Sequence, residues 1–485
     1  MADSDQLWSE WAQIALRSAR DSGAAYADVR ILRVRDQGVL ARNERIHALE
    51  DTDSLGFGLR CLVNGAWGFA GSSVLTPDSI RRVARLAVDM ARASATIKER
   101  DVILAPEVAH VAEHITPREV DPFTVPLDVK TSLLLEANAA MRKVSEVKLA
   151  LSWMTFIKQE QLFASSEGSR IRRDRVIARG LLQANAVGNG DRQNRTYKIS
   201  GRHAGWEHIL AGDLVGHAPR VAQEARDKLF AEVGPVGPHD LILDPEHLYL
   251  TIHESIGHAT ELDRVLGFEA DFAGTSFATI EKVGTYRYGS KIVHAVADTC
   301  TPEYLASTGF DDEGVEGQKW DIIREGVLVD YATGREFAPY LGADRSHGTC
   351  RADGWWSPPI VRIPNLGILP HQGTPEELIR DTKDGIFIQG SGFGSIDQQR
   401  MNFQFGGDLF WRIRHGKKVA LLKNVIYQSQ TPTFWNACDA ICGPEDWRAV
   451  GETNCGKGQP MQFGMMSHYS STSRFRRIEI GRGQE

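Results

Sequence analysis

The 485-residue sequence has few cysteines and no long hydrophobic run. Its six cysteines, which are scattered from Cys61 to Cys455, are too few for a disulfide framework in a chain of this length. No apolar segment follows a basic N-terminus, and no uninterrupted apolar stretch approaches the length that crosses a membrane. We therefore expect a protein without structural disulfides, signal peptide or membrane contact, located in the cytoplasm.

The chain also lacks an excess of positive charge. Its 56 Lys and Arg residues against 63 Asp and Glu residues give a formal net charge of −7. This balance disfavours a general surface for nucleic acid or anionic membranes. We found no internal repeat and no low-complexity tract. We therefore expect no nucleic-acid partner.

What the chain has is an ordinary globular composition, with 42% hydrophobic and 25% charged residues, and 46 glycines. Its length is sufficient for two to four domains. Two Gly-Pro steps between residues 233 and 238 indicate a domain boundary. We expect an N-terminal α/β domain over residues 1–235 and a β-rich domain over residues 236–485.

The N-terminal part combines helix and strand signals. Helices are expected over residues 5–22, from Thr76 and Pro77 onward, over 127–143 and over 221–230. Extended segments are expected near 29–31 and 39–47, and Asn64-Gly65 is typical of a hairpin turn. After residue 258, short apolar runs separated by glycines predict many strands. The fold class is α+β, with helices packed on an antiparallel sheet and a mostly antiparallel second half that carries the helix described next.

The segment from His253 to His258 is the strongest chemical signal. Asp244 is a good N-cap and Pro245 suits the first helical position, so a helix is expected to carry this segment. The histidines are five residues apart, which on an ideal α-helix rotates one from the other by about 140°. A shared metal ion therefore requires a widened turn of the π-bulge type, and Gly257 would supply the backbone freedom.

The residue types then suggest a reaction. Neutral imidazoles are ordinary zinc ligands, and a bound zinc lowers the pKa of its water toward neutrality. Glu254, next to His253, would accept that proton as general base. The residues alone leave open a helix end with scattered polar side chains, because 15 histidines occur in the chain.

A wider pattern resembles the TldD/PmbA family of metallopeptidases, and in particular its TldD branch. Five segments fall in that family's order: HESIGHATELD at 253–263, GFDDEGV at 309–315, GTPEELI at 373–379, SIDQQRMNF at 395–403 and NCGKGQP at 454–460. The resemblance implies that Cys455 is the third ligand of a zinc ion held by His253 and His258. Sequence spacing could not have selected Cys455, which lies far along the chain; Lys457 nearby would favour its thiolate.

The resemblance implies further features. Substrates would be short or unfolded peptides taken into an enclosed cavity, and the chain would form a dimer with a related PmbA/TldE-like subunit or with itself. Glu261 and Asp263 could orient the liganding imidazoles, although a helix-surface charge is an equal reading for each. Two alternatives remain: a cysteine-nucleophile hydrolase that uses Cys455, and a non-catalytic peptide-binding subunit of the same fold.

Three other features have no assigned role. Trp355 and Trp356 could form an exposed aromatic surface or pack in the core. Cys438 and Cys442 could share a helical face, but no further ligands complete a second metal site, and a structural role is favoured. The glycine-rich segment 390–395 is read as a turn near the active cavity, because no helix signal follows it as in a phosphate-binding loop.

Overall fold

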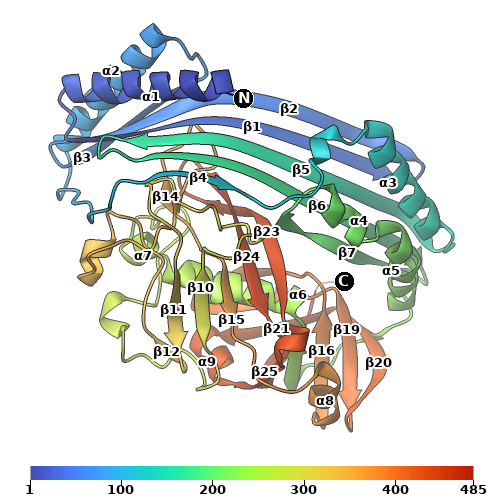
Figure 1. Cartoon of the computed structure of the whole chain (residues 1–485). Coiled ribbons are helices and arrows are strands. Elements are labelled where there is room, and N and C mark those ends of the chain that lie inside the picture. Colours follow the sequence, from blue (N-terminus) through green and yellow to red (C-terminus); the bar gives the residue numbers. More distant parts are fainter. Residues whose placement is uncertain (1, 484–485) are drawn as a thin grey trace.

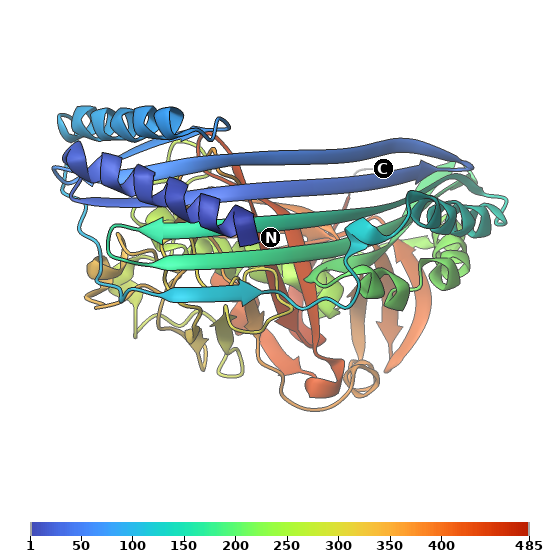
Figure 2. The same cartoon turned by 45° about the horizontal axis from the view of Figure 1, so that its top comes forward.

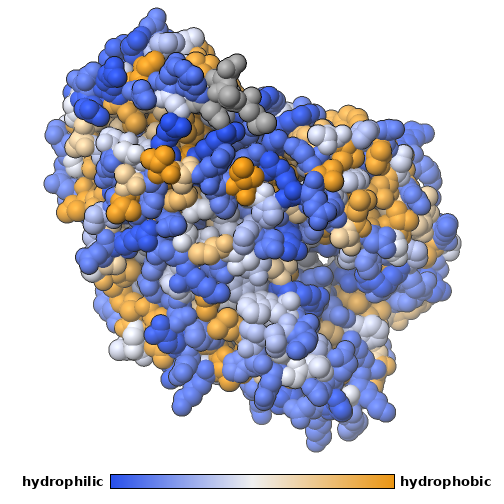
Figure 3. Space-filling model, in the orientation of Figure 1, coloured by the Kyte–Doolittle hydropathy of each residue, from blue (hydrophilic) through white to orange (hydrophobic). Residues whose placement is uncertain are grey.

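The computed structural model describes residues 2–483, and side chains from Gln6 onward. A long, curved sheet from the N-terminal half arches across a more compact C-terminal half (Figures 1 and 2). Within residues 2–483, no helix combines the length and hydrophobicity needed to cross a membrane. Hydrophilic residues cover most of the face seen in Figure 3, with small hydrophobic patches between them.

The first sheet has seven strands in the order β3-β2-β1-β5-β6-β4, and β7 also pairs with β6. Its pairings are antiparallel except that of β4 with β6. The strands are β1 (Tyr26–Arg42), β2 (Arg45–Val63), β3 (Ala66–Ser72), β4 (Val111–Ile115), β5 (Val147–Ser165), β6 (Arg170–Gly188) and β7 (Asp191–His203).

Helices cover the outer face of this sheet at both ends. At one end, α1 (Ala2–Asp21) and α2 (Pro77–Ala95) pack on strand residues that include Val29 and Ile31. At the other end, α3 (Leu127–Arg142) and α5 (Leu214–Lys228) pack on the same face through Val39 and Ala41, with the short α4 (Trp206–Ala211) beside them. Because side chains alternate along β1, these odd-numbered residues all face the helices.

Local signals in this half are largely confirmed. Thr76 accepts a hydrogen bond from the Ser79 N–H, with Pro77 at the start of the helix. Asn64 and Gly65 both have positive φ, as the hairpin turn requires. The expected strand over 39–47 is wrong in one respect: the chain turns at Asn43, φ +51°, so that the segment is shared between β1 and β2. The helix expected at 221–230 begins earlier, at Leu214, and contains Pro219.

The inner face of the sheet meets the C-terminal half through buried charges. Asp312, only 4% exposed, lies 3.7 Å from Arg30 and also forms an ion pair with Arg173. Beside it, Arg60 forms ion pairs with Asp28 at 2.8 Å and Glu313 at 3.1 Å. Paired charges of both signs satisfy each other where neither could be buried alone. These contacts fix the orientation of the sheet over the C-terminal half.

The C-terminal half contains two large sheets and a small one, with orders β17-β18-β21-β25-β9-β16-β19-β20-β8 (β22 pairing with β25), β12-β11-β10-β15-β24-β23, and β13-β14. Most pairings are antiparallel; those of β16 with β9, β15 with β24 and β20 with β8 are parallel. The α+β class with a largely antiparallel second half is confirmed. The ten-stranded sheet consists of β8 (Glu232–Val233), β9 (Gly237–Leu243), β16 (Asp384–Gln389), β17 (Phe393–Ile396), β18 (Asn402–Gly406), β19 (Leu409–Arg414), β20 (Lys417–Lys423), β21 (Val425–Gln430), β22 (Cys438–Ile441) and β25 (Ser473–Arg482).

One helix, α6 (Pro245–Ile252), lies between these sheets (Figure 1). Its residues Leu248 and Ile252 are fully buried in a core that both sheets share. The other elements of this half are β10 (Ala295–Asp298), β11 (Lys319–Arg324), β12 (Val327–Leu328), β13 (Cys350–Arg351), β14 (Ile360–Val361), β15 (Leu366–Ile368), β23 (Arg448–Lys457), β24 (Gln462–Ser470), α7 (Leu262–Val265), α8 (Pro375–Arg380) and α9 (Thr431–Asn436). The packing of α6 between the two large sheets holds its C-terminal end in a fixed position.

Candidate metal centre

The segment with the two histidines continues α6 as a widened turn. The carboxylate of Asp244 caps the helix by accepting a hydrogen bond from the His247 N–H at 2.9 Å. From His253 to Gly257 the backbone is a π-helix, in which the N–H of His258 bonds to the carbonyl of His253, five residues back. The expected widened turn is therefore confirmed. It brings the two imidazoles together, with ring centres 4.8 Å apart.

Gly257 has a different role from the one expected. Its φ of −54° and ψ of −63° are ordinary helical values, so the turn needs no special backbone freedom there. A Cβ at this position would instead approach two carbon atoms of Ile363 to 3.0 Å. Glycine is thus favoured because the wide turn packs closely against a neighbouring side chain.

A third histidine, His468 on β24, fixes the protonation of His253. His468 Nδ1 lies 3.0 Å from the carbonyl oxygen of Leu366, so this nitrogen carries the proton and donates. Its Nε2 is then an acceptor, and it lies 2.8 Å from His253 Nδ1. Burial holds the pKa of His468 well below its ordinary value, which keeps it neutral. The proton of His253 therefore lies on Nδ1, and in the neutral imidazole the lone pair is on Nε2.

The carboxylate of Glu261 determines which ring nitrogen of His258 carries the proton. Glu261 Oε2 lies 2.7 Å from His258 Nδ1, and Glu261 is fully buried. The Nδ1–H donates to this carboxylate, so His258 Nε2 is left with a free lone pair, and it lies 3.4 Å from Cys455 Sγ. This is the contact that a carboxylate orienting an imidazole through its second nitrogen would make.

The three candidate ligand atoms form one buried cluster. One ligand atom from each of His253, His258 and Cys455 lies within 4.8 Å of the others. All three residues are only 5% exposed. Two imidazole nitrogens and one thiolate make a normal donor set for zinc, and three protein ligands leave one position for water. The donor set and the locked tautomers fit a zinc ion.

The pKa of the Cys455 thiol is lowered by groups other than the expected Lys457. Burial by itself raises its pKa, but His258, when protonated, and Arg362 outweigh burial, so the pKa lies below its ordinary value. Lys457 does not face the thiol: its Nζ donates to Asp263 at 2.7 Å and to the carbonyl of Val361 at 2.7 Å. The structure therefore gives Lys457 other partners, and its effect on the thiolate stays a prediction.

Glu254, the expected general base, lies on the same wide turn and pairs with Arg400. The distance from Glu254 Oε2 to Arg400 Nη1 is 2.8 Å, and the Glu254 side chain is 23% exposed. Burial raises the pKa of Glu254, but the histidines His258 and His253, when protonated, and Arg400 outweigh burial, so the pKa lies below its ordinary value. Arg400 has φ +63°, and the turn from Asp397 holds it, with the Arg400 N–H bonded to the Asp397 carbonyl at 3.0 Å.

Asp263, the second expected supporting carboxylate, does not contact either histidine. It accepts hydrogen bonds from Lys457 and from the backbone N–H of Arg264. Lys457 in turn lies 3.3 Å from Glu261, and Arg264 Nε lies 3.3 Å from the same carboxylate. Asp263 thus supports Glu261 indirectly, through the Lys457 ammonium group that binds both carboxylates.

Two residues of the site were missed by sequence reasoning. His468 occurs within an ordinary strand sequence, and no spacing connects it with His253, 215 residues earlier. Arg400 lies within the family-like segment 395–403, but nothing in that segment indicates which side chain reaches Glu254. Only the tertiary fold brings these residues to the wide turn.

A second group of possible ligand atoms is already saturated by protein donors. Asp311, Glu313 and Cys350 also lie within 4.8 Å of one another. However, Asp311 accepts the backbone N–H groups of Glu313, Val315 and Cys350, and Glu313 accepts Arg60 and the N–H of Arg335. Burial raises the pKa of Asp311 to about 8 and that of Cys350 well above its ordinary value. This cluster is a buried hydrogen-bond network.

The remaining candidates lie apart from the cluster. Cys438 begins strand β22 rather than a helix, and it and Cys442 are buried with raised pKa values, since burial disfavours the thiolates. Trp355 packs over Gly56 and donates to Ser54, whereas Trp356 is 49% exposed. The segment 390–395 leads into β17 and contains no helix.

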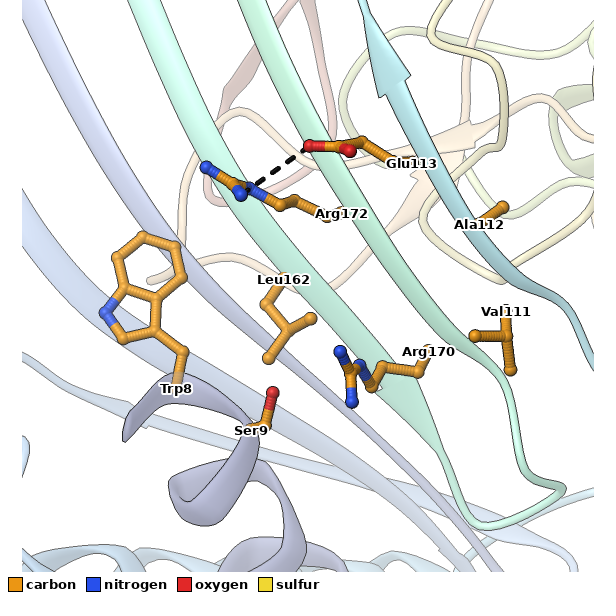
Figure 4. Close-up of a pocket in the computed structure, with 8 residues that line it drawn as sticks. All are labelled: Trp8, Ser9, Val111, Ala112, Glu113, Leu162, Arg170 and Arg172. Atoms are coloured by element: carbon orange, nitrogen blue, oxygen red, sulfur yellow. Dashed lines mark ion pairs between the residues drawn. The ribbon is translucent and has the colours of Figure 1, made fainter. Parts of the chain in front are cut away.

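A cleft of about 310 Å³ lies on the helix-covered outer face of the first sheet (Figure 4). Trp8 and Ser9 of α1 face it from one side, and residues of β4, β5 and β6 face it from the other. An ion pair of 3.5 Å joins Arg172 to Glu113 within this second wall. The sheet separates this cleft from α6 (Figure 1), so it is not part of the candidate metal centre.

Comparisons with known proteins identify the family. Sequence models of the PmbA/TldA metallopeptidase domain 1, central domain and C-terminal domain match residues 27–91, 120–231 and 237–476. The chain is 31% identical to a metalloprotease of Methanocaldococcus jannaschii over 90% of this chain and 94% of that protein. It is 22% identical to a zinc metalloprotease TldD homolog of Saccharolobus solfataricus over 88% of this chain and 90% of that protein.

Solved structures share the fold. A putative modulator of a DNA gyrase from Thermotoga maritima matches with a TM-score of 0.77 at 14% identity, covering 98% of this chain and all of that one. TldE from Thermococcus kodakarensis matches with a TM-score of 0.76 at 16% identity, covering 96% of this chain and 98% of that one. The sequence relationship and the shared fold agree. The chain belongs to the PmbA/TldD family of metallopeptidases.

Proposed function

We propose that this chain is a zinc-dependent peptidase in which His253, His258 and Cys455 hold the ion and Glu254 is the general base. The main support for this proposal is the wide turn. It places His253 and His258, which are five residues apart in the sequence, beside the thiol of Cys455. Coupling of both imidazoles to fixed acceptors, His468 and Glu261, further supports the proposal. A zinc ion at this position would supply an acidified water and a positive charge that polarises a peptide carbonyl.

The side chains around this position have distinct tasks in the proposal. Glu254, ionised beside Arg400, accepts a proton at its carboxylate from the attacking water and returns it to the departing amine nitrogen. Arg400 neutralises the carboxylate in the resting state and orients it through the 2.8 Å contact. Substrates are short or unfolded peptides taken into an enclosed cavity, as the family resemblance implies.

Assembly and location are also part of the proposal. The family relationship and the structural likeness to a TldE protein support a dimer with a related subunit, or with a second copy of this chain. The domain division at residue 235 is kept as a proposal, and strand β8, just before it, already pairs with β20 of the C-terminal half. We place the protein in the cytoplasm.

The experiment that tests the function is peptide cleavage before and after metal removal. We expect 1,10-phenanthroline to abolish turnover of an unstructured peptide, and added zinc to restore it, because the proposal places the metal at the reaction. The assay is run with the chain alone and with a TldE-like partner. Full activity of chelator-treated protein, with its zinc content shown to be negligible, would contradict the proposal.

A cysteine hydrolase is the one alternative that a specific observation favours. Cys455, His258 and Glu261 form a row with contacts of 3.4 Å and 2.7 Å, which resembles a nucleophile, base and orienting acid. In that case His253 would have no function at the thiol. Chelator-resistant turnover that iodoacetamide abolishes would support this alternative, whereas chelator-sensitive turnover supports the metallopeptidase.

The contact between His468 and His253 leads to a prediction about zinc affinity. Replacing His468 with Phe removes the acceptor for His253 Nδ1–H, and we expect zinc affinity to fall about 10- to 100-fold, as for other partners of liganding histidines. His468→Gln offers an amide oxygen to the same N–H and should recover part of the loss. Competition with a zinc chelator measures both variants, and circular dichroism checks their folding. Wild-type affinity in a folded His468→Phe protein would show that the contact does not matter.

A further inference from the structure

A cavity of about 440 Å³ lies between the first sheet and the C-terminal half, outside the candidate metal centre. Its lining includes β3, the chain on both sides of residue 268, the segment 356–360 and the turn 458–460. It is of the size that accommodates small organic groups. The five aromatic residues of its wall are Trp67, Phe69, Phe268, Phe337 and Trp356.

Two carboxylates in this wall lack a cationic partner. Glu336 accepts a hydrogen bond from Trp67 Nε1 at 2.9 Å, and Glu269 accepts one from the Gly458 N–H at 3.2 Å. Neither forms an ion pair with any side chain in the described part of the structure. Burial raises the pKa of Glu336, and the nearby Arg60 and Arg100 offset this only in part. Each of the two carboxylates therefore has a hydrogen bond but no ion-pair partner among the described residues.

The other charged groups of the wall are already paired. Arg60 binds Asp28 and Glu313, and Asp263 binds Lys457. The Arg60 guanidinium also lies 4.1 Å from the ring centre of Trp67, and Arg100 lies 5.1 Å from that of Phe268. Cations therefore already lie over two of the aromatic rings, as the electron-rich faces of these rings favour.

Gln462 supplies an independent sign of an occupant. It lines the cavity and is only 5% exposed. Its Nε2 donates to the carbonyl of Pro358 at 2.9 Å, which fixes the amide orientation, yet its Oε1 has no partner among the described residues. A buried acceptor without a partner is costly, so this atom favours a ligand that brings an N–H donor.

We propose that this cavity binds a guanidinium or alkylammonium group. The aromatic rings that carry no protein cation, two carboxylates without an ion pair and a buried acceptor are the features that recognise an organic cation with N–H donors. The apolar wall would contact the alkyl part of the ligand. The group can come from a free amine or from a basic side chain of a bound peptide. The cavity opens to solvent at Trp356 and Phe268, both about half exposed.

Calorimetric titration of the folded protein with butylguanidine tests the proposal, with uncharged butylurea as the near-isosteric control. We expect saturable binding of butylguanidine, and binding of butylurea that is weaker by about tenfold or more. Glu336→Gln should weaken butylguanidine binding about tenfold and Trp356→Ala several-fold. Glu445→Gln, an exposed matched control, should leave it unchanged. His253→Ala must retain binding, which separates this site from the peptidase proposal.

An unstructured peptide with one internal arginine distinguishes the sources of the cation. Tighter binding of this peptide than of butylguanidine assigns the group to a peptide side chain, and equal or weaker binding assigns it to a free amine. Three results would overturn the proposal: no saturable binding of butylguanidine, equal binding of butylurea, or wild-type affinity in both the Glu336→Gln and Trp356→Ala proteins.

Discussion

Replacing Glu254 with Gln is expected to leave zinc bound but to reduce peptide turnover by about 10²- to 10⁴-fold, the usual contribution of a general base. Glutamine retains the size and one oxygen acceptor of the side chain, so the hydrogen bond from Arg400 can persist. What disappears is the ability to accept a proton. Because Glu254 is not among the three candidate ligands, metal content should not change.

The measurement is kcat on an unstructured peptide, together with zinc per chain. Glu445→Gln, at an exposed position of the chain, is the matched control and should behave like the wild type. Turnover within a factor of two of wild type in zinc-loaded Glu254→Gln protein would remove the general-base role. A loss of turnover accompanied by loss of zinc would instead place Glu254 in metal binding.

Cys455→Ala and His253→Ala are each expected to lose tight zinc binding, because two remaining protein ligands are too few for a stable site. Elemental analysis of the purified proteins should give about one zinc per wild-type chain and far less for either variant. Both side chains are buried in the cluster, so we also expect lower thermal stability of the variants under zinc-loaded conditions.

Exposed residues of the same kinds are the controls for these two variants. Cys300→Ala and His371→Ala change an exposed cysteine and an exposed histidine outside the cluster, and both should retain wild-type zinc. If Cys455→Ala retained wild-type zinc, Cys455 would not be a ligand, however closely its segment resembles the family motif.

The geometry of the wide turn could be predicted from the sequence because it depends only on residues that are close in the chain. The spacing of His253 and His258 required a widened turn, and the structure contains one. Capping by Asp244, the helix from Pro77 and the turn at Asn64 also follow from residues that are adjacent in the chain. These signals depend on backbone geometry within a few residues.

The remainder of the site depends on contacts between distant strands. His468 and Arg400 reach the wide turn, and Arg362 reaches Cys455, only through the packing of α6 between two sheets, which no local pattern specifies. Lys457 illustrates the limit: closeness in sequence suggested that it activates Cys455, but its Nζ donates to Asp263 and to the carbonyl of Val361, which only the tertiary fold brings near it. The family resemblance supplied Cys455, and physical reasoning on the sequence alone would have left it unassigned.

The most direct test of the proposed metal centre is a crystal structure of the zinc-loaded protein with anomalous differences collected at the zinc edge. The account predicts one strong peak, about 2.0–2.1 Å from Nε2 of His253 and of His258 and about 2.3 Å from Sγ of Cys455. The nitrogens bonded to His468 and Glu261 should not be ligands. A peak at Asp311, Glu313 and Cys350, or no peak between the two imidazoles in zinc-loaded crystals, would contradict it.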